Sequence, residues 1–159
     1  MLLLAVSAQA QGAAQSRVDA ELLARGVLAV ACDMLRTQGE FAPFGAGMTV
    51  AHEVMDVAPP SDSNRQRPGG LVTALREGLA RALASGQLQA TALVYEATLS
   101  VPPSLERRDA VAVALNHRSG YAALWVYPYQ VVGGEIRIGE PQIIEQKTAP
   151  VKTKVKPKK

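Results

Sequence analysis

The sequence predicts an α+β domain in which a single antiparallel sheet of about five to six strands carries two helices on one face. Two stretches place apolar residues at helical spacing, several runs in the second half alternate apolar with polar residues, and the connections are short. Short connections favour antiparallel neighbours, and the apolar face of a sheet needs a cover. The length of 159 residues allows one such domain with tails.

The first helix is expected to begin at Ser16, because Ser16 and Asp19 have the spacing of a capping box. Apolar residues recur at helical intervals as far as Met34, and Gly39 ends the helix. Cys32 lies on this helix, where a buried and unreactive thiol is expected. A lone cysteine excludes an intrachain disulfide and a zinc site built from several thiolates.

Two short strands are expected next, at 41–50 and 54–57, joined by a tight turn at His52 and Glu53. Within the first, Gly45-x-Gly47 lacks the further glycine and lysine of a phosphate-binding loop. Proline, glycine and polar residues indicate a loop at 58–70. The second helix has one apolar face and is closed by Gly86; that face consists of Leu71, Leu75, Leu79 and Leu83.

The remaining strands lie in the second half of the chain. Residues 93–101 alternate, and the runs 109–117 and 121–132 flank Arg118-Ser119-Gly120, whose glycine favours a hairpin. Gly133-Gly134 indicates a second hairpin.

A two-residue turn at Ser119 and Gly120 would set the register of the first hairpin. Large rings would then lie opposite alanines on one face, while Val113 and Leu115 would form an aliphatic face that carries the helices. The ring face would need a cover, which a partner chain, a ligand or the termini could supply. A slip of one residue would exchange the two faces. The predicted binding residues are Trp125, Tyr127, Tyr129, Tyr121 and Arg118.

His117 is the candidate for acid/base chemistry, because it ends a strand beside the turn and imidazole exchanges protons near neutral pH. Glu96 and Asp109 are its candidate partners, although no spacing singles either of them out. His52 is expected to be an exposed turn residue. Two distant histidines do not predict a metal site, and no cofactor is predicted.

The two ends differ from the body, which gives three segments: 1–15, 16–146 and 147–159. The first is an apolar leader or clipped signal segment that ends its apolar run in Ala8-Gln9-Ala10, so export to the periplasm is favoured over the cytoplasm. Its apolar run is too short for a transmembrane span.

The last 13 residues contain all six lysines, whereas the body has 11 arginines against 14 acidic residues. A disordered tail with weak attraction to anionic surfaces is expected, and specific nucleic-acid binding is not.

Two motifs carry a resemblance to known proteins. Phe41-Ala42-Pro43-Phe44-Gly45-Ala46 and His117-Arg118-Ser119-Gly120-Tyr121 resemble small bacterial proteins of uncharacterised function with the patterns Phe-x-Pro-Phe-Gly-Ala and His-Arg-x-Gly-Tyr. The resemblance implies no activity. The order of the elements is similar to that of profilin-like and roadblock-type domains, and a fold alone does not determine a function.

Two classes of function follow. The first is a non-catalytic binding or interaction module that self-associates, as a homodimer through the aromatic sheet face, or binds another protein. The alternative is a small enzyme that uses His117 with Glu96 or Asp109 as acid and base.

Overall fold

The computed structural model describes residues 3–58, 68–101, 103 and 106–146. They confirm the α+β class and the single antiparallel sheet, which has seven strands rather than five to six. The predicted tail at 147–159 lies outside the described residues, as does most of the loop predicted at 58–70. The elements are α1 (Leu3–Gln38), β1 (Phe44–Met48), β2 (Val54–Val57), α2 (Pro68–Ala84), β3 (Ala90–Val101), β4 (Glu106–His117), β5 (Ala122–Val132), β6 (Glu135–Ile138) and β7 (Gln142–Glu145).

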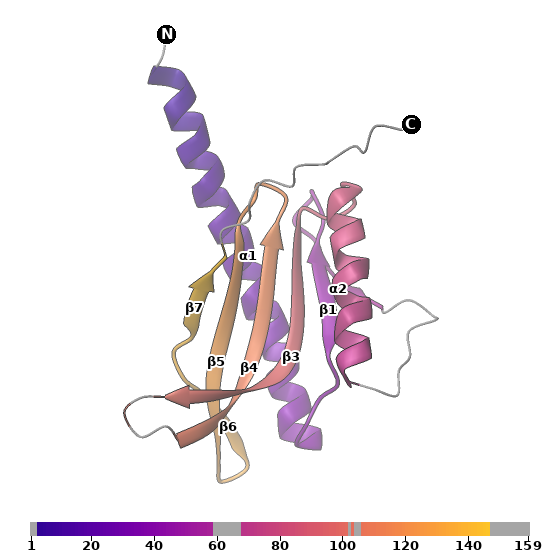
Figure 1. Ribbon diagram of the computed structural model, residues 1–159, viewed down its shortest axis with the longest axis vertical. Helices are drawn as coiled ribbons and strands as arrows, with labels where there is room; N and C mark the ends of the chain where they lie inside the picture. The colour runs from indigo at the N-terminus through magenta and orange to yellow at the C-terminus, as the bar shows by residue number, and fades with distance from the viewer. Residues whose placement is uncertain (1–2, 59–67, 102, 104–105, 147–159) are drawn as a thin grey trace, which may run out of the picture.

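The strands follow the order β2-β1-β3-β4-β5-β6, and β7 pairs with the first half of β5 (Figure 1). Strands β3, β4 and β5 are the long central ribbon, while β2 is a short strand at one edge. The predicted glycine hairpin is confirmed, since Gly133 and Gly134 have φ of 61° and 81° between β5 and β6. Neither helix in the described part of the chain has both the length and the apolar character needed to cross a membrane.

Helix α1 begins at Leu3, so the prediction of a start at Ser16 is wrong. Ser16 and Asp19 lie within the helix and are buried, on the side that faces the sheet. Residues three apart lie on the same face of a helix, as do the residues of a capping box. Ser16 and Asp19 therefore have the spacing of a cap but form a pair that faces the sheet. The predicted end is confirmed: Gly39 has φ of 77° and its N–H donates to the Leu35 carbonyl.

The two helices cover opposite faces of the sheet, so the prediction that both pack on one face is wrong. Val94 and its partner Val113 pack with α1, whereas Leu93 packs with α2 beside its partner Ala114. Consecutive strand residues point to opposite faces, and Figure 1 shows α1 behind the sheet and α2 in front. Residues 110–113 are all buried, as expected of a strand that is covered on both sides.

The predicted register of the β4–β5 hairpin is wrong by one residue. The His117 N–H donates to the Tyr121 carbonyl, so the loop has three residues, Arg118 to Gly120, rather than two. Gly120 has φ of 102°, as expected of the left-handed residue that ends a three-residue hairpin loop. Val113 therefore lies opposite Trp125, and the rings share a face with the valines of β4.

Two glycines let strand β1 lie close to α2 and to the segment that follows it. A Cβ atom built on Gly45 would lie 3.2 Å from Cδ1 of Leu79, and one on Gly47 would lie 2.3 Å from Cδ1 of Leu88. Both leucines are buried. The Gly-x-Gly pair therefore has a packing role, because side chains there would collide with the α2 side of the core.

Candidate functional site

The predicted aromatic binding residues lie under α1 rather than on a free surface. Trp125 and Tyr127 are 6 % and 7 % exposed and belong to the core that α1 covers, with Tyr121 and Tyr129 packed against it. Burial is the main cause that raises the pKa of Tyr127 to about 12. Arg118 is exposed on the hairpin loop. The chain's own N-terminal helix thus covers the rings, so this face needs no partner chain as its cover.

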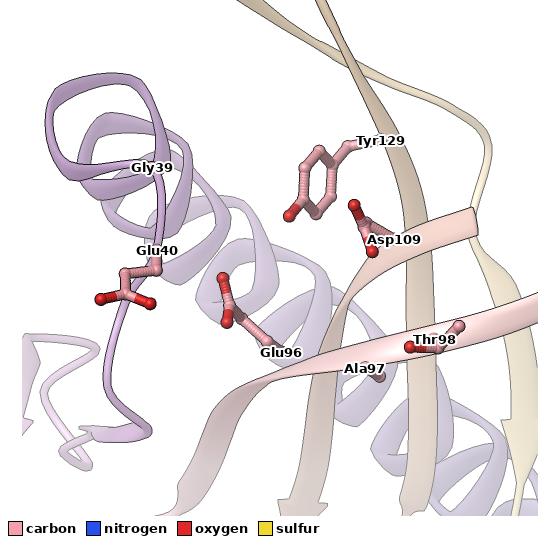
Figure 2. Close-up of a pocket in the computed structure, with 7 residues that line it drawn as sticks. All are labelled: Gly39, Glu40, Glu96, Ala97, Thr98, Asp109 and Tyr129. Carbon is pink, nitrogen blue, oxygen red and sulfur yellow. The ribbon is translucent and has the colours of Figure 1, made fainter. Parts of the chain in front are cut away.

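A cavity of about 320 Å³ lies where α1 ends against the sheet (Figure 2). It is lined by Glu40 after α1, Glu96 on β3, Asp109 on β4 and Tyr129 on β5. Figure 2 shows the Glu96 side chain pointing toward the end of α1, with the Tyr129 ring over the same space. In the described part of the chain none of the three carboxylates forms an ion pair with a basic side chain.

The carboxylates make the cavity electronegative, and the pKa of the Glu96 carboxyl is raised there. Partial burial is the largest cause that raises the pKa of this carboxyl above its usual range. The N–H of Phe41 opposes this by donating to the carboxylate, while the negative charges of Glu40 and Asp109 raise the pKa further. The negative end of the α1 dipole adds to the same field.

The three carboxylates of this cavity can attract a positive charge. Across the residues that the structure describes, no set of three His, Cys, Asp or Glu side chains is arranged to hold a metal ion.

His117 lies at the other end of the sheet from its predicted partners. It follows Asp109 by eight positions on β4, which corresponds to about 26 Å along a strand. Glu96 lies near Asp109, since it pairs with Val111. The structure therefore does not bring Glu96 or Asp109 to the imidazole.

The partner of His117 is Asp19 on α1, which the sequence analysis treated as a capping residue. His117 Nε2 lies 3.1 Å from Asp19 Oδ2, and His117 Nδ1 lies 2.9 Å from Ser119 Oγ. The side chains of Asp19 and His117 are only 3 % and 9 % exposed. A carboxylate, an imidazole and a hydroxyl thus form a continuous hydrogen-bonded chain, which we call the Asp19–His117–Ser119 chain.

Further polar side chains hold the Asp19 carboxylate. Gln15 Nε2 donates to Oδ1 at 2.9 Å, and Gln89 Nε2 lies 3.4 Å from Oδ2. His52 Nδ1 lies 3.4 Å from Oδ1 and 3.2 Å from Gln89 Nε2. His52 is half exposed in the β1–β2 turn with φ of 61°, so the expected exposed turn histidine also reaches the buried carboxylate.

Two further serine contacts extend the chain. Ser16 Oγ lies 2.5 Å from Ser119 Oγ and donates to the Gly12 carbonyl at 2.7 Å. The cluster therefore joins α1, the β1–β2 turn and the β4–β5 hairpin. The sequence predicts Ser16 and Asp19 at the N-terminal cap of a helix, whereas they lie on its buried face. Their spacing of three residues was the one signal in the sequence that they act together.

The lone thiol differs slightly from its expected setting. Cys32 is half-buried rather than buried, and desolvation raises its pKa. A raised pKa disfavours the thiolate, which is the reactive form.

Comparison with known proteins adds no assignment, because no protein-family model, no curated protein and no solved structure matches the chain.

Proposed function

We propose that this domain is a protein-interaction module that associates with a second copy of itself through the free edge of β2. The observation that carries the proposal is an edge strand with exposed apolar side chains. In the described part of the chain no strand pairs with the outer edge of β2. Unpaired edges of this kind are templates for pairing with another chain.

The alternation of hydrogen bonds between β1 and β2 identifies the backbone groups of β2 that point away from β1. The Thr49 N–H donates to the Glu53 carbonyl, so residues 53, 55 and 57 direct their backbone groups toward β1. Val54 and Asp56 therefore direct their N–H and C=O groups outward. An added strand would find two donors and two acceptors there.

The side chains around this edge are apolar and open to solvent. Val50, Val54 and Met55 are 59 %, 51 % and 49 % exposed. Burying such side chains is favourable, at about 25 cal/mol per Å² of apolar surface.

A two-fold axis at Met55 gives a self-complementary pair of strands. Val54 of each copy then lies opposite Asp56 of the other, so no two like charges are opposed, and Met55 contacts the same residue of the other copy. Four backbone hydrogen bonds form, each worth about 1 kcal/mol net. Because association costs several kcal/mol, a weak dimer with a dissociation constant of about 10 µM to 1 mM is expected.

At the opposite side of the sheet, the β7 edge suits this role less well. Pro141 directly precedes β7 and has no N–H, which is a common device for blunting an edge strand.

The experiment compares two variants of the full chain by sedimentation equilibrium. Asp56→Pro removes the outward N–H without disturbing the bonds to β1, whereas Asp56→Ala keeps that N–H and is the matched control. Loss of one bond per copy should raise the dissociation constant about thirtyfold in Asp56→Pro, with a change below about threefold in Asp56→Ala. A wild-type protein that stays monomeric up to about 1 mM, or an Asp56→Pro variant that dimerises like wild type, would refute the proposal.

A further inference from the structure

We propose that Ser119 is an activated nucleophile that attacks acyl and phosphonyl groups with good leaving groups, with His117 as its base and Asp19 as the positioning carboxylate. This inference goes beyond the interaction role and does not depend on it. It rests on the Asp19–His117–Ser119 chain.

The hydrogen bonds of the ring define where the imidazole proton lies. The Ser119 N–H donates to His117 Nδ1 at 3.1 Å, so Nδ1 is an acceptor. The ring proton is therefore on Nε2, where it donates to the Asp19 carboxylate at 3.1 Å. In this tautomer the Ser119 N–H and Ser119 Oγ share the single Nδ1 lone pair, at 3.1 Å and 2.9 Å, so the bond from the N–H gives way when Nδ1 takes the hydroxyl proton. A base within hydrogen-bond distance of a hydroxyl, oriented by a third group, is the arrangement that activates serine nucleophiles.

The base is held in place before any reaction. The Asp19 side chain is 3 % exposed, and Gln15 and Gln89 donate to its two oxygens. The His117 side chain is 9 % exposed, so its ring orientation is fixed by packing as well as by hydrogen bonds. A buried carboxylate beside the ring also stabilises the imidazolium that forms when Nδ1 accepts a proton.

Ser119 itself lies at the accessible end of the chain. It occupies the exposed loop between β4 and β5. Ser16 Oγ donates to the Gly12 carbonyl, so it accepts from Ser119 across their 2.5 Å contact. The Ser119 hydroxyl proton thus has two acceptors, Ser16 Oγ and His117 Nδ1, and only the second makes the oxygen nucleophilic.

The acylation step passes one proton through His117 Nδ1. Ser119 Oγ forms a bond to the carbonyl carbon of an ester, and its proton moves to His117 Nδ1. The bond from that carbon to the leaving alcohol oxygen then breaks, and the alcohol departs with the proton from Nδ1. Water later hydrolyses the acyl-serine by the same route, releasing a carboxylic acid. With a phosphonyl fluoride, the Oγ–P bond forms, the P–F bond breaks, and fluoride leaves while the proton passes through Nδ1 to solvent.

The backbone N–H groups of the loop limit which substrates Ser119 can attack. The N–H groups of Arg118, Ser119 and Gly120 donate to Gln89 O, His117 Nδ1 and His117 O respectively. They are not directed at a developing oxyanion, a contribution worth about 10²–10³ in rate in serine hydrolases. Activated esters and phosphonyl fluorides need this help least, so they are the expected substrates, and turnover is slow.

The test labels the full chain with a fluorophosphonate probe and locates the adduct by peptide mass spectrometry. Ser100 is exposed on β3, and the hydrogen bonds of the two imidazoles go to Gln89, Ser119 and Asp19, so it serves as the internal control in the same digest. Ser119 should react at least about a hundredfold faster than Ser100, the range of general-base assistance.

Variants separate activation from structure. Labelling of Ser119 should fall about a hundredfold or more in His117→Gln and in Asp19→Asn, and should persist or increase in Ser16→Ala, which removes the competing acceptor. Circular dichroism checks that each variant is folded. If a variant does not fold, the labelling rate of Ser119 relative to Ser100 in the wild type tests the proposal. Absence of label on Ser119, or a rate unchanged in folded His117→Gln, would overturn the assignment.

Discussion

Substitution of Gly47 by alanine should destabilise the protein, and the structure predicts by how much. The added Cβ would lie 2.3 Å from Cδ1, 2.8 Å from Cδ2 and 3.0 Å from Cγ of Leu88, which is 2 % exposed. Overpacking of a buried site costs about 1–3 kcal/mol, and the loss of glycine flexibility in the unfolded chain returns about 0.4–1 kcal/mol. The expected net loss is about 1–2 kcal/mol, or about 2–8 °C in melting temperature.

The assay is urea unfolding followed by the fluorescence of Trp125, with Gly45→Ala as the matched control on the same strand. At Gly45 the nearest atom to the new Cβ is Cδ1 of Leu79 at 3.2 Å, so the expected change is within about 0.5 kcal/mol. If Leu88 is the obstacle, Gly47→Ala should cost about 1 kcal/mol less in a Leu88→Ala background than alone. Equal stabilities of the Gly45→Ala and Gly47→Ala variants would refute this account of the close approach between β1 and Leu88, which follows α2.

Two further predictions concern Glu96 and Trp125. Because the pKa of Glu96 is raised in the folded state, the wild type loses stability relative to Glu96→Gln as pH rises through that pKa, so the variant should be the more stable at pH 7. Solvent screening limits the gain to under about 0.5 kcal/mol, and it should vanish below about pH 3, where the carboxyl is neutral in both states; urea unfolding at pH 7 and at about pH 3 measures it. Trp125→Ala should cost about 3–5 kcal/mol in unfolding free energy because the ring is buried under α1, and wild-type stability in that variant would contradict the packing.

Local patterns were sufficient for much of the fold. Helical spacing located the second helix, glycines marked the ends of both helices, and short connections implied an antiparallel sheet. Each of these features depends on residues that are close in sequence. The helix ends were predictable because Gly39 and Gly86 adopt positive φ values that other residues rarely adopt.

The errors arose where long-range packing decides the outcome. The loop Arg118-Ser119-Gly120 accommodates a two-residue or a three-residue turn, and only the packing of β5 under α1 distinguishes them. Alanines at 110, 112 and 114 were interpreted as partners of rings, although they face the other side of the sheet from the rings. A register that differs by one residue exchanges the faces of a whole strand.

The candidate site was predicted only in part. His117 was identified because it ends a strand beside a turn, but Asp19 is 98 positions away and no local pattern connects the two. Their contact requires the helix to pass over the end of the hairpin. Distant polar partners of this kind are determined by tertiary structure and cannot be found from spacing alone.

The polar cluster around Asp19 also determines where α1 lies along the sheet. Small residues such as Ala20, Ala24 and Ala31 present a smooth surface to the sheet, which by itself would tolerate sliding along the helix axis. A shift by one turn, about 5.4 Å, would carry Asp19 beyond the reach of His117 and leave a desolvated carboxylate without its donors. Burying a carboxylate without its hydrogen bonds is strongly unfavourable, so one carboxylate selects a single alignment from several of nearly equal hydrophobic energy.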